Sequence, residues 1–476
     1  MRLAPLVTLW ILASFSFGAP APGRSPNIVF ILADDLGWGE LGCYGSTFNE
    51  TPHLDQLARE GVRMTQAYAA APVCSPYRAS LLTGQYPARH GLLDYLRPTT
   101  ANPLSPRHVT IAERLKAAGY VTGMIGKWHL SGYRYHKAPI ELRATDHGFD
   151  EELVTEIKGV GNGANFFPYV FRTQPISWNS AGKDKLLPGK EYLVDRMNHE
   201  AVRFIERHRE KPFFLYLSHF APHSILNGRP DLVEKYRRKH PPGKSTSSRC
   251  HLCQDTGLEG DPLNHWAGDH NPHLAAMIEG IDQGVGMIVK KLEELRLSKD
   301  TLIIFTSDNG GELKVTSNAP LRGGKSQLFE GGIRVPLIVK WPGKVPGDKV
   351  CNSPTCNVDF YPTFLEVSAV KRDESQILDG RSVLELFQRP GAKRKGRTLY
   401  WHYPLPKPHF LGGVSAGAIR EGKWKLIEWF GKKEMSLFDL DRDPGEERDL
   451  AAIHPEMAER LQNKLSLWRN SIPPTK

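Results

Sequence analysis

The sequence predicts an α/β fold: a large mixed, mainly parallel sheet flanked by helices, with a smaller C-terminal α+β domain carrying a short antiparallel sheet. Two observations lead to this prediction. Up to about residue 375, apolar runs of strand length alternate with helical patterns, which is typical of parallel strands joined by crossover helices. After that point the apolar runs become short and closely spaced, which is typical of antiparallel strands.

Five continuous apolar runs predict the main sheet. Strands buried on both faces read as unbroken apolar segments, whereas half-exposed strands alternate. The predicted strands are residues 28–33, 120–125, 213–218, 302–307 and 335–339.

Helical patterns lie between these runs. Residues 110–118 open with a capping box formed by Thr110 and Glu113, and they stop before Gly119, a residue type that commonly follows a helix. Residues 272–295 show a longer amphipathic pattern.

The C-terminal unit is predicted from four short runs and a closing helix. The runs are residues 397–402, 414–419, 424–428 and 436–439, and the helix covers residues 455–468. We therefore expect a main catalytic domain over residues 22–375 and a C-terminal α+β subdomain over residues 376–476.

The first 21 residues have the pattern of a signal peptide. Arg2 precedes an apolar core at 6–17, and the small residues Gly18, Ala19 and Ala21 follow it. The core is shorter than the roughly 20 apolar residues that cross a bilayer, and no later segment qualifies. We expect an exported protein without a membrane span, periplasmic or extracellular in a bacterium, lysosomal or secreted in an animal.

The composition limits the classes of binding partner, and the cysteine positions suggest candidate disulfides. Lys and Arg total 62 against 52 for Asp and Glu, a net charge of +10, which is compatible with anionic partners. The sequence has no arginine-rich arm, zinc finger or RNA-binding signature, so we expect no nucleic-acid partner. Cys351 and Cys356 flank a short loop and are candidates for a disulfide, as are Cys250 and Cys253.

Polar clusters follow four of the predicted strands at the point where each strand ends. In open α/β sheets, ligands bind beyond the carboxyl ends of the strands, so the four clusters predict one shared site. The clusters are Asp34-Asp35, Gly126-Lys127-Trp128-His129, the segment 219–223 and Asp308-Asn309-Gly310.

The residue types in these clusters predict a cation next to a bound anion. The carboxylate and amide oxygens of Asp34, Asp35, Asp308 and Asn309 suit calcium or magnesium better than zinc or copper. Several cationic or hydrogen-bond-donating side chains would face this cation, which indicates that an anionic substrate group binds next to it. A metal ion and cations around an oxyanion are typical of phosphoryl or sulfuryl transfer. The donors are Arg78, Lys127, His129, a histidine of segment 219–223 and Lys325.

Cys74 is the candidate nucleophile. The segment from Cys74 to Gly84 reads as the first turns of a helix, with Pro76 acceptable near its start. Cys74 would then lie at a helix N-terminus, where backbone N–H groups favour anions. The alternative is a buried structural cysteine, the usual fate of an isolated one.

These motifs resemble those of a known family. Cys74-x-Pro76-x-Arg78 is similar to the first signature of the type I, formylglycine-dependent sulfatases of the alkaline phosphatase superfamily. Gly119-Tyr120 with segment 126–129 is similar to the second, and segment 324–336 also matches. The resemblance implies that a formylglycine-generating maturation enzyme, or an equivalent one, oxidises Cys74 to formylglycine.

The resemblance also implies roles for the site residues. One calcium ion per chain would be held by Asp34, Asp35, Asp308, Asn309 and the modified Cys74. Arg78 would steady the formylglycine, and Lys127 and Lys325 would bind the sulfate. His129 would hold and later deprotonate the aldehyde hydrate, and His223 would contact the substrate as general acid.

Two points depart from the family pattern or stay open. Ser131 stands where many relatives have glycine. Both His219 and His223 follow the third strand, and we favour His223 because Ala-Pro-His is the usual family form. The rival functions are a catalytically idle protein that binds sulfated glycans and a phosphatase or phosphodiesterase of the same superfamily. The serine or threonine nucleophile typical of the latter is absent at position 74.

The substrate class is a separate hypothesis: a sulfated carbohydrate. Aromatic residues in the candidate rim loops suit stacking on sugar rings, although ordinary packing is the favoured explanation for any one of them. A basic segment at 235–249, expected to be a surface loop, would attract a polyanion. The alternative is that its charges belong to a solvated helix end and loop. The aromatic candidates are Trp178, Trp266, Trp401, His402 and Tyr403.

Overall fold

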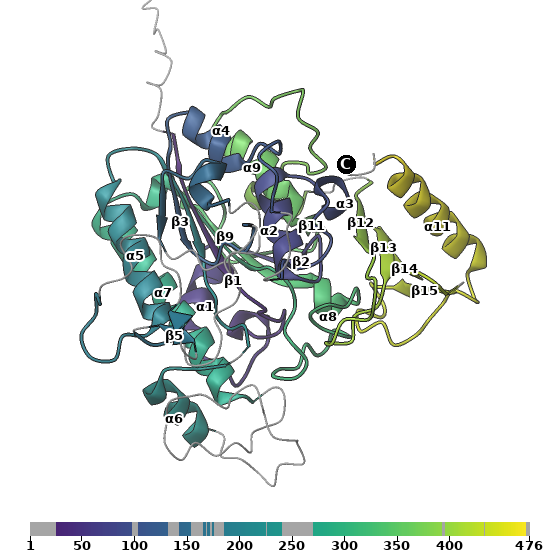
Figure 1. The fold of residues 1–476 in the computed structure, drawn as a ribbon, viewed down its shortest axis with the longest axis horizontal. Coiled ribbons are helices and arrows are strands. Elements are labelled where there is room, and N and C mark those ends of the chain that lie inside the picture. Colours follow the sequence, from purple (N-terminus) through teal and green to yellow (C-terminus); the bar gives the residue numbers. More distant parts are fainter. Residues whose placement is uncertain are drawn as a thin grey trace, which may run out of the picture.

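The computed structural model describes residues 25–97, 103–131, 142–153, 165–167, 169–171, 174–175, 185–224, 226–239, 270–392, 396–432 and 434–472. A nine-stranded, mainly parallel sheet runs through the main domain, and a four-stranded antiparallel sheet lies beside it (Figure 1). The predicted fold class is confirmed.

The main sheet has the strand order β10-β2-β9-β8-β1-β7-β3-β4, with β11 also paired to β2. Its five predicted strands all form, within one residue of the expected ends. The strands are β1 (Asn27–Ala33), β2 (Val62–Tyr68), β3 (Val121–Gly126), β4 (Glu151–Leu153), β7 (Phe213–Ser218), β8 (Thr301–Ser307), β9 (Arg334–Lys340), β10 (Lys349–Cys351) and β11 (Thr355–Cys356). A separate two-stranded ribbon pairs β5 (Val170–Phe171) with β6 (Gln174–Pro175).

One predicted parallel strand runs the other way. β9 pairs antiparallel with both β8 and β2. A parallel return needs a crossover that carries the chain back along the sheet. The segment between β8 and β9 contains only the four-residue helix α8 (Glu330–Ile333), so the chain enters β9 from the end at which β8 stopped. The orientation expected for this strand was therefore wrong.

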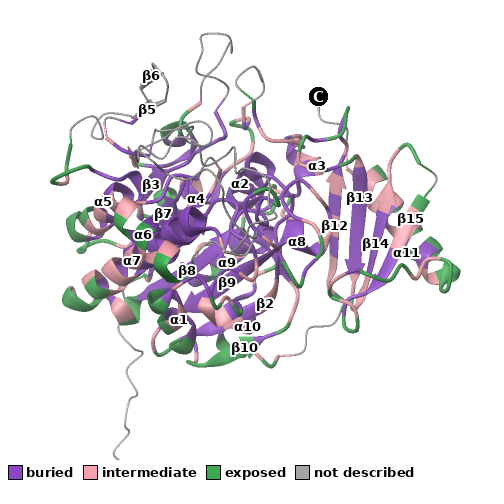
Figure 2. Cartoon of the chain, turned by 90° about the horizontal axis from the view of Figure 1, so that it is seen from below, coloured by how far each residue is buried: buried purple, intermediate pink, exposed green. Residues whose placement is uncertain are grey.

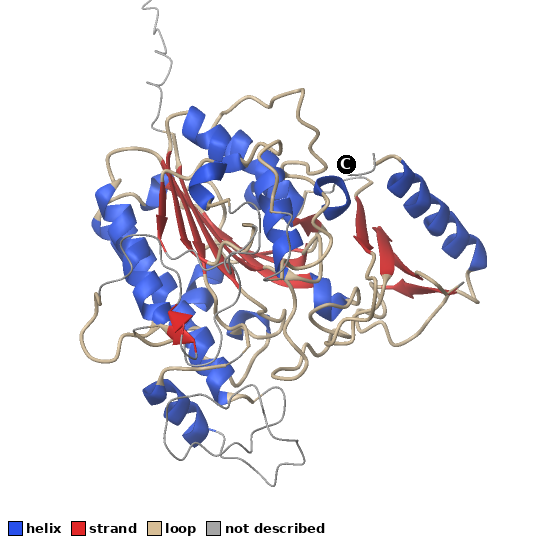
Figure 3. Ribbon diagram, in the orientation of Figure 1, coloured by secondary structure: helices blue, strands red, loops and turns tan. Residues whose placement is uncertain are grey.

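Helices cover both faces of the main sheet (Figure 3). Strand β1 shows why, because its alternate residues enter two different cores. Val29 and Ile31 pack with α1 (Pro52–Arg59), α5 (Leu193–Arg207) and α7 (Pro272–Glu294). Ile28 and Phe30 pack with the helices of the opposite face, which are α2 (Cys74–Thr83), α4 (Ile111–Ala117), α9 (Phe360–Val367) and α10 (Leu384–Gln388).

Local sequence signals set these helix ends. The capping box expected at the start of α4 is present, with Thr110 accepting from the Glu113 N–H and Glu113 accepting from the Thr110 N–H. The buried strands and the exposed outer faces of the helices are visible in Figure 2. The remaining helices are α3 (Pro87–His90) and α6 (Pro230–Lys239). Within the described residues, no helix combines the length and apolarity needed to cross a membrane.

The C-terminal sheet is a meander of four strands, with one helix against it (Figure 1). Ile419, Leu426 and Leu437 of the sheet pack against Leu461 and Leu465 of the helix. The elements are β12 (Thr398–Tyr403), β13 (Ala416–Glu421), β14 (Trp424–Trp429), β15 (Glu434–Asp439) and α11 (Pro455–Asn470).

A buried ion cluster joins this sheet to the main domain. Lys425 of β14 is fully buried, and its Nζ lies 3.0 Å from Glu330 Oε1 and 2.8 Å from Glu446 Oε1. Glu330 begins α8 and also accepts a hydrogen bond from the Tyr68 hydroxyl at 2.6 Å. Lys425 is thus the ion-pair partner of Glu446, and it shares Glu330 with Arg334, whose Nη1 lies 3.5 Å from Glu330 Oε2.

Lys425→Met is expected to lower the free energy of unfolding by about 3–5 kcal/mol. Buried Glu446 loses its counter-charge, and Glu330 keeps only the more distant Arg334 at 3.5 Å. Urea unfolding followed by tryptophan fluorescence measures the change. The matched control is Lys432→Met in the turn after β14, where a single 4.0 Å pair between exposed side chains is lost, and we expect no measurable change. Equal stability of Lys425→Met and the wild type would contradict the structural role of the cluster.

Candidate active site

Four neighbouring strands bring the predicted polar clusters to one edge of the main sheet. β8, β1, β7 and β3 lie side by side in this order and run parallel. Ala33 pairs with Ser307, and Gly126 pairs with Ser218, so the residues that follow these strands start at the same level. The predicted convergence of the clusters at the carboxyl edge is confirmed.

Three carboxylates and one amide form the acidic side of the site. Asp34, Asp35 and Asp308 are buried, and one oxygen of each lies with Cys74 Sγ in a group whose atoms are all within 4.8 Å of one another. Asn309 donates to Asp35 Oδ1 at 2.7 Å, and its own buried Oδ1 has no hydrogen-bond partner among the described residues. An unpartnered amide oxygen beside three carboxylates fits a hard cation.

Three buried cations face these carboxylates, one for each. The pairs are Arg78 Nη2 with Asp308 Oδ2 at 2.7 Å, Lys127 Nζ with Asp34 Oδ2 at 2.5 Å, and Lys325 Nζ with Asp35 Oδ2 at 2.6 Å. Burial opposes the ionisation of Asp34, but nearby positive charges, Lys127 first among them, hold the pKa of this carboxyl well below its ordinary value. The site therefore combines fixed negative and positive charge without water between the partners.

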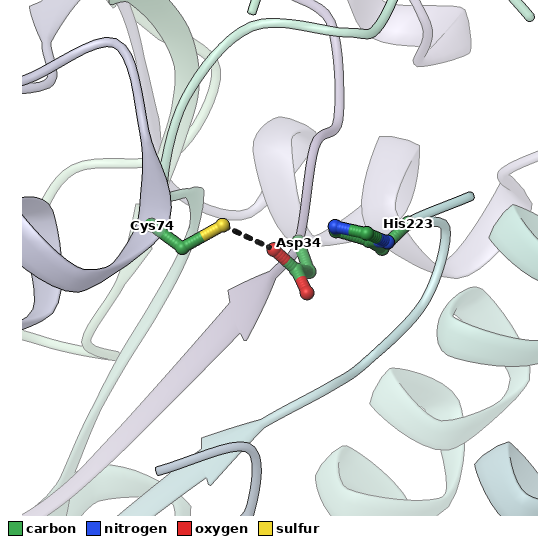
Figure 4. Close-up of side chains that lie close together, drawn as sticks. All are labelled: Asp34, Cys74 and His223. Carbon is green, nitrogen blue, oxygen red and sulfur yellow. Dashed lines mark hydrogen bonds between the residues drawn. The ribbon is translucent and has the colours of Figure 1, made fainter. Parts of the chain in front are cut away.

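Cys74 lies at the first residue of α2, as predicted. Its Sγ donates to Asp34 Oδ1 at 3.3 Å and accepts from Lys127 Nζ at 3.3 Å. Figure 4 shows the thiol pointing at Asp34, with His223 on the other side of that carboxylate. Burial raises the pKa of the Cys74 thiol well above its ordinary value, and the charge of Asp34 raises it further. The unmodified residue is thus a neutral thiol, which is a poor nucleophile.

His129 is held in one tautomer. Its Nε2 lies 2.9 Å from the carbonyl oxygen of Leu96, so Nε2 carries the proton, while the buried Nδ1 has no hydrogen-bond partner among the described residues. Burial lowers the pKa of His129 well below its ordinary value, and the charge of Lys127 lowers it further. A neutral imidazole with a free lone pair is suited to accept a proton.

The two histidines after β7 have different surroundings. His223 Nε2 lies 2.9 Å from Lys325 Nζ and 3.5 Å from Asp35 Oδ2, and its side chain is 21% exposed. His219 is fully buried, and neither of its ring nitrogens has a hydrogen-bond partner among the described residues. Burial lowers the pKa of His219 to about 3. Of the two, His223 is the one beside the charged groups of the site.

Ser218 is a site residue that the sequence reasoning missed. Its hydroxyl accepts a hydrogen bond from Arg78 Nη1 and donates to the Lys127 carbonyl oxygen at 2.9 Å. It therefore ties the helix that bears Cys74 to the loop after β3. The available signal was a polar residue closing an otherwise apolar strand, directly before His219.

Two of the aromatic residues proposed for sugar stacking belong to the core. Trp401 and Tyr403 are each 1% exposed, and the Trp401 indole donates to the Ala69 carbonyl oxygen at 2.7 Å. Alternate residues of β12 face the main domain, so these two side chains fill the space between the sheets. Stacking on a sugar is therefore excluded for both, and the favoured alternative of ordinary packing holds. His402 lies beside the ring of Phe430, with the ring centroids 5.5 Å apart.

The basic segment expected to be a loop is partly helical. Residues 235–239 belong to α6, and Lys235 and Lys239 both pair with Glu50, at 2.7 and 3.0 Å. Several of its charges are therefore offset by neighbouring carboxylates.

Some of the predicted features lie outside the described residues. They are residues 1–21, Trp178, Trp266, Lys244, Arg249, Cys250 and Cys253.

Cys351 and Cys356 are separate, buried thiols. Cys351 pairs with Met64 and Cys356 with Tyr68, both on β2. Four residues of strand separate these positions by about 13 Å, beyond the roughly 7 Å between Cα atoms that a disulfide tolerates. The candidate disulfide therefore does not form in this structure.

Taken together, the site suits the hydrolysis of an ester of a tetrahedral oxyanion. Lys127, Lys325 and Arg78 supply fixed positive charge, and the acidic group fits a cation that would add to it. Cys74 lies among these groups, and His129 and His223 bring ring nitrogens of the kind that take part in proton transfer.

Comparison with known proteins defines the family. Residues 26–370 match the family described as Sulfatase, and residues 324–470 match the family described as N-sulphoglucosamine sulphohydrolase, C-terminal. The chain is 32% identical to mouse steryl-sulfatase, covering 94% of this chain and 82% of that protein. It is also 32% identical to dog N-acetylgalactosamine-6-sulfatase, covering 95% of this chain and 87% of that protein.

Solved structures agree with these relatives. The structure of Ps i-CgsB in complex with k-i-k-neocarrahexaose has a TM-score of 0.77 and 28% identity, covering 95% of this chain and 94% of that one. A sulfatase structure from the glycosaminoglycan metabolism of Bacteroides thetaiotaomicron has a TM-score of 0.72 and 26% identity, covering 94% and 100%. The chain belongs to the sulfatase family of the alkaline phosphatase superfamily, and it is an enzyme that hydrolyses sulfate esters.

Proposed function

We propose that this sulfatase acts on sulfated carbohydrates, with formylglycine at position 74 as the nucleophile and one calcium ion at the acidic group. The observation that carries the proposal is the position of Cys74, whose Sγ is 3.3 Å from both the Asp34 carboxylate and the Lys127 ammonium. In the active enzyme, the oxygens of the hydrated aldehyde would stand where this sulfur stands. An oxygen between a cation site and a lysine is well placed to attack sulfur.

The first half of the reaction forms a sulfated enzyme. Hydration of the aldehyde places two hydroxyls on the carbon of residue 74. One of them passes its proton to the Asp34 carboxylate, which the Cys74 thiol contacts at 3.3 Å, and its oxygen attacks the sulfur of the bound ester. A new O–S bond forms, and the S–O bond to the alcohol breaks. The hydrogen-bonded pair of His223 and Lys325, 2.9 Å apart, supplies the proton that the departing alcohol takes.

The second half releases sulfate. His129 Nδ1, whose lone pair is unused among the described residues, takes the proton of the second hydroxyl. The carbonyl of formylglycine forms again, and the bond between its carbon and the sulfate oxygen breaks. Water then adds to the aldehyde and restores the hydrate. A serine or cysteine has no second hydroxyl and would remain sulfated.

The residues that would hold calcium are Asp34, Asp35, Asp308 and Asn309, with an oxygen of modified residue 74. When bound, the ion would supply positive charge that makes the hydroxyl more acidic and the sulfate more electrophilic. Arg78 keeps Asp308 in place through its 2.7 Å ion pair. The oxygen-rich donor set supports calcium over zinc.

The carbohydrate substrate is supported by the relatives. Ps i-CgsB was solved with a neocarrahexaose, and the dog relative is named for N-acetylgalactosamine 6-sulfate. The mouse relative is named for steryl sulfates, so a sterol is the competing substrate class. The polar and charged surroundings of His223 and Lys325 favour a leaving group that carries hydroxyls.

Two measurements test this proposal. Mass spectrometry of the peptide that contains residue 74, taken from active enzyme, should show the aldehyde, and an active enzyme with only a free thiol there would refute the nucleophile. A panel of N-acetylgalactosamine 6-sulfate, carrageenan oligosaccharides, steroid sulfate and nitrophenyl sulfate, assayed for released sulfate, tests the substrate. Steroid sulfate cleaved best, with every sugar left intact, would refute the carbohydrate assignment.

The general acid can be identified by its dependence on the leaving group. His223→Ala should lower kcat/KM on a sugar sulfate by about 10²–10⁴-fold, because the alcohol leaves poorly without a proton. Nitrophenol leaves more easily, so nitrophenyl sulfate should be partly spared. His219→Ala is the matched control and should affect both substrates by the same small factor. A larger, leaving-group-dependent loss at His219 would reverse the assignment.

A further inference from the structure

The loop between β12 and β13 brings a third histidine, His409, to the site. On one side this loop packs on the segment that bears Lys325. Gln327 Nε2 donates to the Leu411 carbonyl oxygen at 3.3 Å, and a Cβ on Gly413 would lie only 2.0 Å from the Ser326 carbonyl oxygen. The backbone of the loop therefore rests directly on the residue after Lys325.

On the other side His409 meets the segment that orients His129. The rings of His409 and Tyr95 are 5.6 Å apart in an edge-to-face arrangement. Leu96, the next residue, accepts from His129 Nε2 at 2.9 Å and donates to Ser75 Oγ at 3.0 Å. His409 thus lies between the segment that follows Lys325, whose charge acts on its pKa, and the segment of Tyr95 and Leu96, which contacts the residue after Cys74.

The hydrogen bonds of His409 fix its tautomer. The Leu411 N–H donates to His409 Nδ1 at 3.1 Å, so Nδ1 bears the lone pair, and the proton of the neutral ring is on Nε2. Burial lowers the pKa of His409. The negative charge of Asp94 raises this pKa and the positive charge of Lys325 lowers it, and the net shift is downward. The ring is therefore neutral near pH 7.

Nε2 is the unexplained group. His409 is only 7% exposed, and its Nε2 is buried without a hydrogen-bond partner among the described residues. A buried donor left without an acceptor is costly, so such atoms in native proteins commonly meet a ligand or water. The next residue, Phe410, is by contrast largely in solvent, with 70% of its surface exposed.

Phe410 forms an exposed surface next to His409. Its ring stacks on His409 with the centroids 4.5 Å apart and the planes at 26°. Lys314, on the loop that follows the metal-site residues of β8, places its Nζ 5.7 Å from the Phe410 ring centroid. An exposed aromatic face beside one buried donor and a nearby cation is a suitable platform for an anionic, hydroxyl-rich ring.

We infer that His409 and Phe410 form the subsite for the leaving group, a sugar ring that lies on the Phe410 face while His409 Nε2–H donates to one of its oxygens. This inference rests on the proposed carbohydrate substrate and adds the residues that recognise it. The sulfate would be held by Lys127 and Lys325, so the subsite acts on the alcohol side of the scissile bond. Aryl sulfates lack the oxygen that His409 would contact.

Two substitutions separate the roles of the two ring nitrogens. His409→Asn retains an acceptor near Nδ1 for the Leu411 N–H but removes the outward donor. His409→Gln places an amide N–H near the position of Nε2. On the sugar sulfate with the highest kcat/KM in the panel, we expect His409→Asn to lower kcat/KM about 10-fold, as for the loss of one hydrogen bond. His409→Gln should recover most of this loss, and nitrophenyl sulfate should change less than about 2-fold.

Further variants complete the test. Phe410→Ala should raise KM for the sugar and leave kcat for nitrophenyl sulfate unchanged. The control is His454→Ala, an exposed histidine whose ring lies 5.2 Å from Trp424 in the same C-terminal unit, and it should alter neither substrate. An equal loss on both substrates in His409→Asn, or no loss on the sugar, would overturn the subsite. A wild type that cleaves no sugar sulfate would instead refute the proposed substrate class and the subsite with it.

Discussion

Cys74→Ala is expected to abolish turnover, with a loss of at least about 10⁴-fold in kcat on nitrophenyl sulfate, because it removes the nucleophile itself. Lys127 and Lys325 would still bind sulfate, so affinity for inorganic sulfate should persist. The side chain of Cys74 is small and buried, so alanine fits the site and the melting temperature should stay close to that of the wild type.

Cys74→Ser separates the formylglycine mechanism from ordinary serine catalysis. A serine hydroxyl at this position is able to accept the sulfuryl group, but it has no second hydroxyl with which to expel sulfate. We expect at most one turnover per enzyme, followed by a stable sulfate ester on residue 74 that intact-mass spectrometry detects. Continuous turnover by Cys74→Ser would contradict the proposed mechanism.

The second large effect is expected from Asp308→Ala, which should remove bound calcium and lower activity by at least about 10³-fold. The substitution deletes an oxygen ligand, and it also leaves Arg78 without its 2.7 Å partner. Elemental analysis of the purified protein, together with kcat on nitrophenyl sulfate, measures both consequences. About one calcium ion per chain is expected in the wild type.

The matched control is Asp282→Asn. Asp282 is also fully buried, but it accepts hydrogen bonds from the backbone N–H groups of His53 and Leu54, away from the site. This variant should retain calcium and turnover per folded molecule. Chelation of the wild type should abolish activity, and calcium should restore it. Full activity after calcium removal, or stoichiometric zinc in the active enzyme, would contradict the metal assignment.

The structure also explains why some sequence predictions succeeded. Strands 213–218 and 302–307 are buried on both faces, so each of them appears in the sequence as a continuous apolar run. The capping box of α4 is a local motif whose hydrogen bonds form between residues three apart. The site clusters were readable because parallel strands place their carboxyl ends together whatever their order in the sheet.

Other features depend on contacts that no short segment records. β2 alternates buried and half-buried residues and lacks an apolar run, so its pairing with β9 became visible only in the sheet. Trp401 looked like a rim residue, but the direction of β12 turns it into the space between the two sheets. The local form Ala-Pro-His already favoured His223 over His219, but the contact of His223 with Lys325, 102 residues later in the chain, is visible only in the structure.

The sequence by itself therefore determined the fold class, five strands of the main sheet, the four C-terminal strands and the sulfatase motifs, because each of these leaves a local or periodic pattern of residues. The tertiary structure decided the direction of β9, the burial of Trp401 and the arrival of His409 beside Lys325. These outcomes depend on how segments far apart in the chain pack together. The loop between β12 and β13, for example, packs on residue 326 because the two surfaces fit closely at Gly413.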